Sequence, residues 1–443
     1  MKKIISEIKK TIVPSKSLQK SKMEIADLAF KLVEEEIRKY SEVINLEFGG
    51  SFAKGTWLAK NADVDIFIKF KNKTQEAKFE EISKKIGFAS MKKYSPYVRY
   101  SEHPYVEAKI KNTKINVVPC YDVKLGEWKS SADRSPFHTK FMKKSLTPKM
   151  RDEVRLLKTF LQSTGIYGAE IAKQGFSGYV SEVLILNFKS FENVIKSIAK
   201  IQENQIIGKT TQRFETPIVI VDPIDSDRNL AAAISEENIG KFILNSRVFQ
   251  VNPSEKFFGP KKLKKSKLNL DTILILNFDF KMRSPDIIWG QIKRATKSLK
   301  TQLEIGGFKV LRSTSYNDEK KEAYLIFLLE SPIISKKYQK IGPEFFREKD
   351  CRSFVSKNIL KSDLMWINDD RKIVSLEKRK NFEAVKFLSE FLKHNLQTGI
   401  PKGLQDDFKN GFKIFLGSKG LPKSIKKVVN ELTSTDDTAF YFN

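Results

Sequence analysis

Gly49-Gly50-Ser51-Phe52-Ala53-Lys54 is followed a short way along the chain by Asp63-Val64-Asp65. From Val64 to Phe70 apolar residues alternate with others, which predicts a strand with one apolar face. Residues two apart on a strand point to the same side of the sheet. We therefore expect Asp63 and Asp65 to present two carboxylates on the side opposite the apolar stripe.

A pair of carboxylates close to a glycine-serine bend indicates phosphate chemistry. Two like charges held this close are costly unless a cation lies between them, and a divalent cation bound to a nucleoside triphosphate is the natural partner. At the bend, Gly50 lets the backbone approach phosphates, so that amides and the Ser51 hydroxyl can donate to them. Taken alone, an Asp-x-Asp strand is often only a solvated face, and a Gly-Gly-Ser segment is often only a turn.

The bend and the strand together resemble the polymerase-beta-like nucleotidyltransferase superfamily, which acts through a pair of metal ions. That superfamily needs a third carboxylate on a neighbouring strand, and at the expected place this chain has Asn116. An amide oxygen can ligate Mg²⁺ but brings no negative charge, so we expect nucleotide binding to survive while the chemical step is weakened or uses a rearranged ligand. Asp122 is too far along the strand to substitute, roughly 20 Å, whereas Glu107 on the paired strand is a candidate replacement.

The balance of charge points to a polyanionic partner. The 443 residues include 81 Lys and Arg against 53 Asp and Glu, a formal net charge of +28, with 40% hydrophobic residues. Such an excess favours a folded protein that binds nucleic acid or an anionic membrane surface, although a lysine-rich proteome would also produce it. Cys120 and Cys351 are too few for a cysteine-rich zinc site or a disulfide framework. With no signal-peptide pattern and no apolar run long enough to span a bilayer, we expect a soluble cytoplasmic protein that does not associate with membranes.

The hydrophobic pattern predicts at least two domains of mixed type. Residues 1–145 are expected to form a small mixed sheet covered by helices, with helices over 22–40 and 75–86 and strands over 43–48, 64–70, 105–110 and 115–118. From residue 149 the pattern becomes helical, with helices over 149–164, 178–198 and 234–248 and a strand over 217–221. The polar, lysine-rich segment 259–267 indicates a boundary. Beyond it we expect strands over 272–280, 308–313 and 322–329, a helix over 285–303, and a mostly helical remainder that includes 382–396.

Several longer strings of sequence sharpen the resemblance to the archaeal (class I) CCA-adding enzymes. They are 99–106 (Arg-Tyr-Ser-Glu-His-Pro-Tyr-Val), 117–121 (Val-Val-Pro-Cys-Tyr), 133–138 (Asp-Arg-Ser-Pro-Phe-His), 153–158 (Glu-Val-Arg-Leu-Leu-Lys), 165–170 (Gly-Ile-Tyr-Gly-Ala-Glu), 175–179 (Gly-Phe-Ser-Gly-Tyr), and 221–223 (Val-Asp-Pro) with Arg228-Asn229. The matches cover roughly residues 40–250, and the C-terminal part matches more loosely. The resemblance implies a multidomain α+β protein: a polymerase-beta-like catalytic head (1–145), a helical neck that recognises the nucleotide and its base (146–258), and an RRM-like α/β body with a helical tail that binds tRNA (268–443).

The resemblance also implies an activity and a set of site residues. The activity is template-independent addition of C, C and A to the tRNA 3′ end from CTP and ATP, with two Mg²⁺ ions. Carried over position by position, the triphosphate would be held by Gly50, Ser51 and Lys54. The metals would be held, and the reaction catalysed, by Asp63 and Asp65, with Asn116 in doubt. The nucleotide site would be completed by His138, Lys158, Tyr167 and Arg228. Arg228 would contact the incoming base, because a guanidinium offers donors to the ring nitrogens of cytosine and adenine. The sequence does not decide whether the protein forms a homodimer.

The residues themselves leave plainer interpretations open. Arg151, Arg155, Lys158 and Gln162 recur at helical spacing and form either a functional basic row or a solvated one. His138 follows Pro136-Phe137, which suggests a constrained loop. Tyr167 lies between two glycines and is either a phosphate donor or an ordinary aromatic at a helix end, and Arg228 is either a base contact or a surface ion-pair partner.

Three basic tracts, 261–267, 293–300 and 377–380, are candidates for contacts with tRNA phosphates. Two rival functions remain: a poly(A)-polymerase-like terminal transferase, and a catalytically impaired tRNA-binding relative in which Asn116 has abolished activity.

Overall fold

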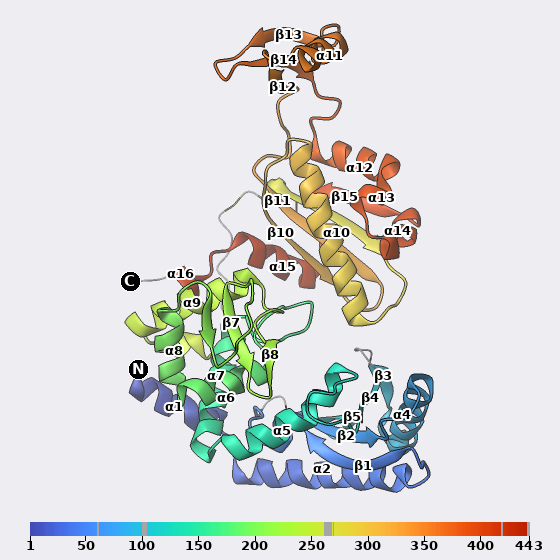
Figure 1. Cartoon of the computed structure of the whole chain (residues 1–443), viewed down its shortest axis with the longest axis vertical. Coiled ribbons are helices and arrows are strands. Elements are labelled where there is room, and N and C mark those ends of the chain that lie inside the picture. Colours follow the sequence, from blue (N-terminus) through green and yellow to red (C-terminus); the bar gives the residue numbers. More distant parts are fainter. Residues whose placement is uncertain (60–61, 100–103, 261–267, 269, 418–419, 441–443) are drawn as a thin grey trace. The chain divides into compact units, whose positions relative to one another are not determined.

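The computed structural model describes residues 1–59, 62–99, 104–260, 268, 270–417 and 420–440. The chain forms two compact units, one of Met1–Lys262 together with Asp436–Asn443 and the other of Leu263–Thr435 (Figure 1). Helices and sheets are mixed in both units, which confirms the predicted multidomain α+β class. The basic tract 261–267 and part of the string 99–106 lie outside the described residues. Among the described helices, none combines the length and apolar character needed to cross a membrane.

The first unit begins with a five-stranded mixed sheet in the order β1-β2-β5-β4-β3. β2 and β5 run parallel, and the other neighbouring pairs are antiparallel. The strands are β1 (Val43–Gly49), β2 (Val64–Phe70), β3 (Tyr97–Arg99), β4 (Tyr105–Ile110) and β5 (Thr113–Tyr121). The alternation of residues in β2 therefore sets one apolar and one polar side at the centre of this sheet.

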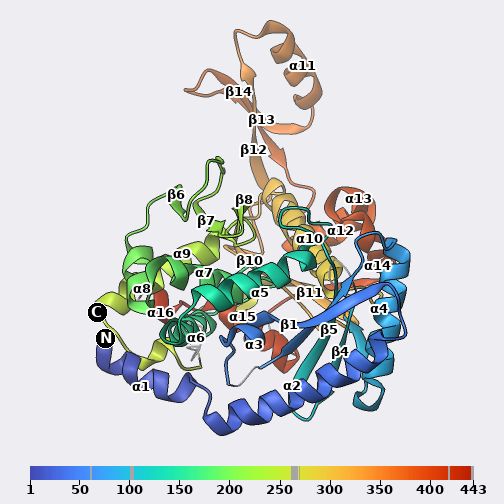
Figure 2. The same cartoon turned by 60° about the horizontal axis from the view of Figure 1, so that its bottom comes forward.

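Two helices cover the apolar side of the sheet. α2 (Lys16–Ile37), whose first turn is capped by the Ser15 hydroxyl, packs against α4 (Glu76–Ser90) and against the strands, as Figure 2 shows. The core between them buries the apolar residues of both helices and of β2, namely Ile25, Ala29, Val33, Phe79, Ile82, Ile86, Val64, Ile66, Ile68 and Phe70. On α2, Leu28 is 43% exposed, whereas Ala26 and Ala29 are fully buried.

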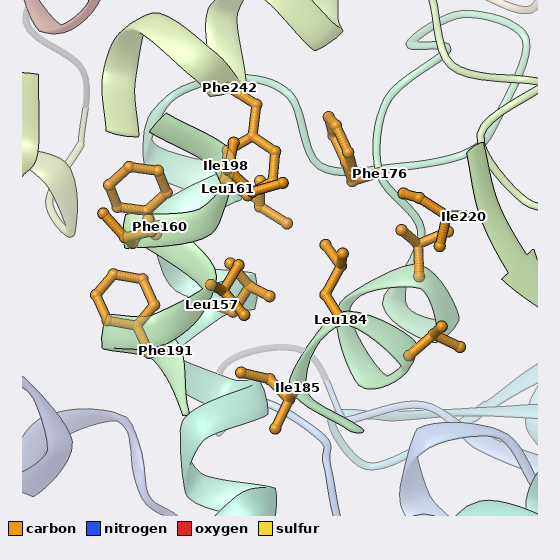
Figure 3. Packing of buried hydrophobic residues seen from close by; sticks show 14 of the residues in the cluster. Leu157, Phe160, Leu161, Phe176, Leu184, Ile185, Phe191, Ile198, Ile220 and Phe242 are labelled. Atoms are coloured by element: carbon orange, nitrogen blue, oxygen red, sulfur yellow. The ribbon is translucent and has the colours of Figure 1, made fainter. Parts of the chain in front are cut away.

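The rest of the first unit is mostly helical and has its own core. Its helices are α1 (Lys2–Ile12), α5 (Arg134–Ser145), α6 (Pro148–Ser163), α7 (Gly178–Phe188), α8 (Phe191–Ala199), α9 (Glu236–Val251) and α16 (Asp437–Phe440), which packs on α9. A small sheet holds β6 (Gln205–Ile207), β7 (Ile218–Asp222) and β8 (Asp225–Asn229). Figure 3 shows Leu157, Phe160 and Leu161 of α6 packed in this core with Leu184 of α7 and Phe191 of α8.

The predicted single helix over 178–198 is wrong. The chain forms α7 and α8 instead, because Lys189 adopts a left-handed backbone (φ 70°) and the Ser190 hydroxyl then caps α8. The prediction for α6 is confirmed: Thr147 caps it, Pro148 occupies its first turn, and it ends just before Gly165. The helix α1 and the strands β3, β6 and β8 were not predicted, since each is short or lies in a strongly polar stretch.

The second unit contains a four-stranded antiparallel sheet in the order β10-β11-β9-β15. Its elements are β9 (Ile273–Asp279), α10 (Pro285–Ile305), β10 (Val310–Asn317), β11 (Glu322–Leu329), α12 (Ala384–His394), α13 (Leu396–Gly399), α14 (Lys402–Lys409), β15 (Phe412–Leu416) and α15 (Lys423–Thr433). The sheet is apolar on both faces: α10, α12 and α14 cover one, and α15 covers the other. The strands of the centre, β9 and β11, are accordingly buried along almost their whole length.

The expectation of a mostly helical remainder is wrong over 337–378. Here β12 (Lys337–Glu344), β13 (Ser362–Ile367) and β14 (Lys372–Lys378) form a separate sheet in the order β12-β14-β13, which α11 (Glu348–Asn358) contacts through β12 (Figure 1). These strands lack a regular alternation of apolar and polar residues: β13 reads Ser-Asp-Leu-Met-Trp-Ile and β14 reads Lys-Ile-Val-Ser-Leu-Glu-Lys, so the hydrophobic pattern did not predict them.

Candidate active site

A row of side chains crosses the polar face of the first sheet. Gly49 pairs with Asp65, Asp65 with Asn116, Asn116 with Glu107, and Glu107 with Tyr97. Directly opposed residues on neighbouring strands point to the same side, so this row lies opposite the helices α2 and α4. The register places Asn116 immediately beside Asp65, where the superfamily was expected to carry its third carboxylate.

Gly50 brings the backbone against the carboxylate of Asp65. It opens the short helix α3 (Gly50–Lys54) with a left-handed backbone, φ +60°. A Cβ atom at this position would lie only 1.7 Å from Oδ2 of Asp65, so no larger residue fits without moving that carboxylate. The bend that carries Ser51 therefore lies directly beside Asp65.

Asn116 holds one side of Asp65 and leaves one oxygen of its own without a partner. Its Nδ2 donates to Oδ1 of Asp65 at 2.8 Å. Its Oδ1 is buried and accepts no hydrogen bond. A buried acceptor without a donor is uncommon and costly, so this oxygen is available to a cation.

At the two predicted metal-binding carboxylates, burial outweighs the nearby positive charges. Burial raises the pKa of Asp65 above its ordinary value; the hydrogen bond from Asn116 opposes this shift, and the charge of Asp63 adds to it. Burial likewise raises the pKa of Asp63. The charge of Lys114 lowers this pKa, the charge of Glu107 raises it, and the charge of Lys22 lowers it. Oxygen donors that are short of positive charge fit a hard divalent cation. Among the described residues no cluster of three His, Cys, Asp or Glu side chains could hold a metal, so a metal bound by Asp63 and Asp65 would need a ligand of another type, such as the amide oxygen of Asn116.

Glu107, the candidate replacement for the missing aspartate, is already engaged. Its side chain accepts a hydrogen bond from the Tyr97 hydroxyl and one from Nε of Arg99 at 3.3 Å, and Nζ of Lys114 lies 3.9 Å away. Both carboxylate oxygens therefore have donors. In this arrangement Glu107 belongs to the edge of the site and offers no open oxygen comparable to that of Asn116.

A buried carboxylate that the sequence analysis missed, Glu182 of α7, gathers two of the predicted nucleotide-binding residues. Lys54 Nζ lies 2.6 Å from its Oε2, the Thr56 hydroxyl donates to its Oε1 at 2.5 Å, and Lys158 Nζ lies 3.6 Å from the same oxygen. Lys158 also donates to the carbonyl oxygen of Thr56 at 3.1 Å. Although burial acts to raise it, Lys54 and then Lys158 hold the pKa of Glu182 below its ordinary value.

Tyr167 lies beside the same cluster. A Cβ atom on Gly178 would lie 3.0 Å from the Tyr167 hydroxyl and 3.3 Å from Nζ of Lys158. Burial raises the pKa of Tyr167, and the carboxylates of Glu182, Glu170 and Asp63 raise it further. Tyr167 is therefore a neutral hydroxyl within electrostatic reach of both Glu182 and Asp63.

A second missed carboxylate, Asp222 at the end of β7, gathers the remaining predicted residues. His138 Nε2 and Arg228 NH1 each lie 3.0 Å from its Oδ2, and the Tyr179 hydroxyl donates to its Oδ1 at 2.8 Å. The rings of His138 and Tyr179 stack with centroids 3.8 Å apart, and Lys54 Nζ lies 5.4 Å from the Tyr179 ring centre. The Asp222 side chain is fully buried, whereas that of Arg228 is 38% exposed, so Arg228 does form an ion pair but keeps donors near solvent.

The proline near His138 suggested a loop, but this prediction is wrong. His138 lies in α5, because Pro136 stands in the first turn of the helix, where proline is tolerated. Burial lowers the pKa of His138, and its hydrogen bond with Asp222 acts in the opposite direction. For its part, Asp222 has a pKa below the ordinary value: burial is the largest single influence and raises it, but the interactions with His138, the Tyr179 hydroxyl and the backbone amide of Ile224 together outweigh burial.

The basic row on α6 is not a solvated face. Arg155 donates from NH2 to the carbonyl oxygen of Gly55 at 2.6 Å and from Nε to that of Trp57 at 3.0 Å. Arg155 and Lys158 are both buried, and only Gln162 at the end of the row is exposed. The row therefore binds the backbone that follows α3 and joins the sheet to the helical part of the unit.

The two missed carboxylates had a sequence signal. Glu182 interrupts the otherwise apolar helical run from Val180 to Leu186, and Asp222 ends the apolar strand that begins at Ile218. A lone acid within an apolar element is either paired or functional, because an unpaired buried charge is too costly. That signal identifies the residue but not its partners.

Comparison with known proteins agrees with this geometry. Three family models match consecutive parts of the chain: a nucleotidyltransferase domain at residues 31–143, the second domain of tRNA nucleotidyltransferase at 152–259, and the C-terminal domain of the CCA-adding enzyme at 271–417. A CCA-adding enzyme of Saccharolobus shibatae is 34% identical over 385 residues, which cover 86% of this chain and 90% of that protein. The chain belongs to the CCA-adding enzyme family.

Other relatives in the family are similar to the same extent. The CCA-adding enzyme of Sulfurisphaera tokodaii is 33% identical over 396 residues (89% of this chain and 91% of that protein), and that of Sulfolobus acidocaldarius is 34% identical over 385 residues (85% and 91%). A solved structure of a cytoplasmic RNA terminal U-transferase matches 59% of this chain and 98% of its own with a TM-score of 0.45 and 13% identity, which is too distant to support an argument. The family resemblance drawn from the motifs is confirmed.

Proposed function

We propose that this protein adds C, C and A to the 3′ end of tRNA from CTP and ATP without a nucleic-acid template. Family membership supports the reaction, and one structural observation supports the place: Asp65 and the unpartnered Oδ1 of Asn116 lie side by side next to the Gly50-Ser51 bend. Carboxylate and amide oxygens beside a phosphate-binding bend suit the divalent cations that nucleotidyl transfer uses.

The metal site consists of Asp63, Asp65 and the amide oxygen of Asn116. These three side chains would hold two Mg²⁺ ions, whose chemistry would be activation of the attacking hydroxyl and stabilisation of the leaving pyrophosphate. The residues contribute by position: Asn116 fixes the orientation of the Asp65 carboxylate through its Nδ2, and Gly50 leaves the space that this carboxylate occupies.

The nucleotide lies between the bend and the helices. Ser51 and Lys54 hold the triphosphate, with Lys158 and the neutral hydroxyl of Tyr167 beside them. His138 and Arg228, both bound to Asp222, flank the base. A guanidinium held by one NH group keeps other donors for the N3 of cytosine or the N1 of adenine, which are both acceptors.

The division of labour that we propose is a catalytic head (1–145), a neck (146–258) and a tRNA-binding body and tail (268–443), acting in the cytoplasm. In the last part, Lys293, Arg294, Lys297 and Lys300 lie on α10, and the tract 377–380 lies at the end of β14. Such residues bind phosphates without selecting sequence, as recognition of many tRNAs by shape requires. Binding of tRNA should then weaken steeply between about 50 and 200 mM salt.

The test is incorporation of labelled nucleotides into a tRNA that ends just before CCA. With CTP alone we expect two C residues, and with CTP followed by ATP one further A. Incorporation of A but no C would instead identify a poly(A)-polymerase-like transferase. Binding of tRNA with no incorporation at any Mg²⁺ or Mn²⁺ concentration would identify an inactive relative, the outcome that Asn116 would explain.

A further inference from the structure

We propose that Glu182 is a positioning residue of the nucleotide site: it holds the ammonium groups of Lys54 and Lys158 together and leaves their cluster one positive charge in excess, to be balanced by the triphosphate. This inference rests on the proposed function and assigns a role to a carboxylate that is fully buried and therefore acts through its neighbours. It concerns how the site binds nucleotides, and makes no claim about the chemical step.

The contacts show that Glu182 joins three separate pieces of chain. Lys54 ends α3, Thr56 follows it, Lys158 lies on α6, and Glu182 itself lies on α7. All three partners reach one carboxylate, with Lys54 and Thr56 on different oxygens. Lys54 and Lys158 come from different elements, and Glu182 is the counter-ion that brings their two charges to one carboxylate.

The charges in this cluster do not cancel. Two ammonium groups face one carboxylate, and the side chains of Lys54, Lys158 and Glu182 are 8%, 2% and 0% exposed. A buried excess of one positive charge is unfavourable unless an anion completes the site. The electrostatic influence of Lys54 reaches the carboxylate of Asp65, so the excess charge lies on the side of the acidic row where a metal-bound triphosphate would lie.

Glu182 also sets whether Lys158 is charged. Burial lowers the pKa of Lys158 to about 8; Glu182 opposes this shift, while Lys54 and Arg155 add to it. The neighbouring Tyr167 hydroxyl is neutral, so Glu182 is the group that keeps Lys158 protonated near neutral pH. Removing its charge leaves burial and two cations acting in the same direction, and Lys158 loses its proton at a lower pH.

The experiment compares Glu182→Gln with Glu153→Gln. Glu153 is a matched control: it is a buried carboxylate on α6 of the same unit, bound to Lys9 and to the backbone amide of Phe191, and it has no contact with the cluster. For Glu182→Gln we expect the KM values for CTP and ATP to rise roughly tenfold, the effect of weakening one charge-assisted contact, with the KM for tRNA unchanged. For Glu153→Gln we expect both sets of KM values to stay at the wild-type level.

The decisive measurement is equilibrium binding of CTP as a function of pH, which needs no turnover. Binding to the wild type should weaken as the pH rises through about 8, where Lys158 loses its proton, and in Glu182→Gln this loss should begin at lower pH. If CTP binding and its pH midpoint are the same in Glu182→Gln, Glu153→Gln and wild type, Glu182 is only structural and the proposal is wrong.

A second variant covers the case in which Glu182→Gln does not fold. Glu182→Asp keeps the charge at a shorter reach, so the KM for nucleotides should rise while the pH midpoint of CTP binding stays at the wild-type value. Wild-type KM values in a folded Glu182→Asp protein would overturn the proposal. Failure of the proposed function is distinguishable, because the wild type would then bind CTP but add no nucleotide to tRNA.

Discussion

Asp65 and Glu182 are two carboxylates of the same unit in opposite electrostatic states. Asp65 is surrounded by protein atoms but keeps part of its side chain open to solvent, receives one hydrogen bond from a neutral amide, and has a raised pKa. Glu182 is closed off completely, is bound to two lysines and a threonine, and has a lowered pKa. Burial outweighs the nearby charges at Asp65, whose side chain is partly exposed to solvent. At Glu182 the side chain is fully buried and both carboxylate oxygens accept hydrogen bonds.

We interpret this difference as that between the ligand-binding acid and the positioning acid that we propose. A carboxylate that costs stability in the free protein is retained because something from outside completes it. A carboxylate whose partners are all present contributes by fixing where those partners lie. The same side-chain chemistry thus serves two roles, and the identity of the neighbours, rather than the depth of burial, decides between them.

The substitution Asp65→Asn should have the largest effect on activity. We expect kcat for nucleotide addition to fall roughly a thousandfold or more, because the metal site loses a charge placed where the transition state needs it. The melting temperature without Mg²⁺ should stay the same or rise, because an unfavourable charge is removed while the hydrogen bond with Asn116 can persist. Asp122→Asn, at an exposed position, is the control and should change neither quantity. A large loss of stability in Asp65→Asn would contradict the assignment.

Glu182→Gln should affect stability in the opposite direction. It leaves Lys54 and Lys158 with buried charges and no counter-ion, so we expect the free energy of unfolding of the first unit to fall by about 3–5 kcal/mol. Urea denaturation at pH 7, followed by the fluorescence of Trp57 and Trp128 in a background where Trp289 and Trp366 are Phe, measures it. A change below about 1 kcal/mol would show that the cluster is not the saturated centre described here.

The contrast between these two acids also shows what the sequence could predict. The strand alternation at Val64–Phe70 and the Gly50 bend are local signals, so the strand and the face of Asp65 could be derived, whereas the interest of Asn116 came from the family resemblance. The cluster at Glu182 could not, because its partners come from elements more than a hundred residues apart in sequence, and neither charge pattern nor periodicity encodes which distant residues meet. Family resemblance supplied Lys54 and Lys158 but not the carboxylate between them.

Asp222 illustrates the same limit. The resemblance pointed to His138 and Arg228 separately, and the structure brings them to one carboxylate from α5 and β8. The strand β8 carries almost no apolar residue, so its formation depends on pairing with β7 rather than on any propensity of its own. Local sequence therefore could not place Arg228 on a strand.

The substitution Asn116→Asp tests whether the proposed metal site lacks a negative charge. A carboxylate there adds the charge that the amide lacks, so we expect turnover to rise about tenfold, equivalent to about 1.4 kcal/mol in the barrier, and half-maximal activity to need less Mg²⁺. Steady-state kinetics against Mg²⁺ concentration measure both. No change, or a loss of turnover, would mean that the amide oxygen already serves as an adequate ligand or that its hydrogen bond to Asp65 matters more than charge. The control is Asn112→Asp, at an exposed position in the turn before β5.

The smallest effect expected is a pH-dependent difference in stability between wild type and Asp65→Asn. A raised pKa means that the folded protein binds the proton more tightly than the unfolded chain, so the contribution of Asp65 to stability is lost as the pH rises from its ordinary value of 3.8 towards its folded value. Glu182 behaves in the opposite sense, because its lowered pKa makes its contribution present above 4.5 and lost only at lower pH. Without Mg²⁺, the melting temperature of Asp65→Asn should therefore exceed that of wild type by an amount that grows above pH 4. Mg²⁺ should raise the melting temperature of wild type more than that of the variant, because a ligand stabilises the state that binds it. A difference that stays constant with pH, or an equal response to Mg²⁺, would mean that Asp65 is no less satisfied than Glu182.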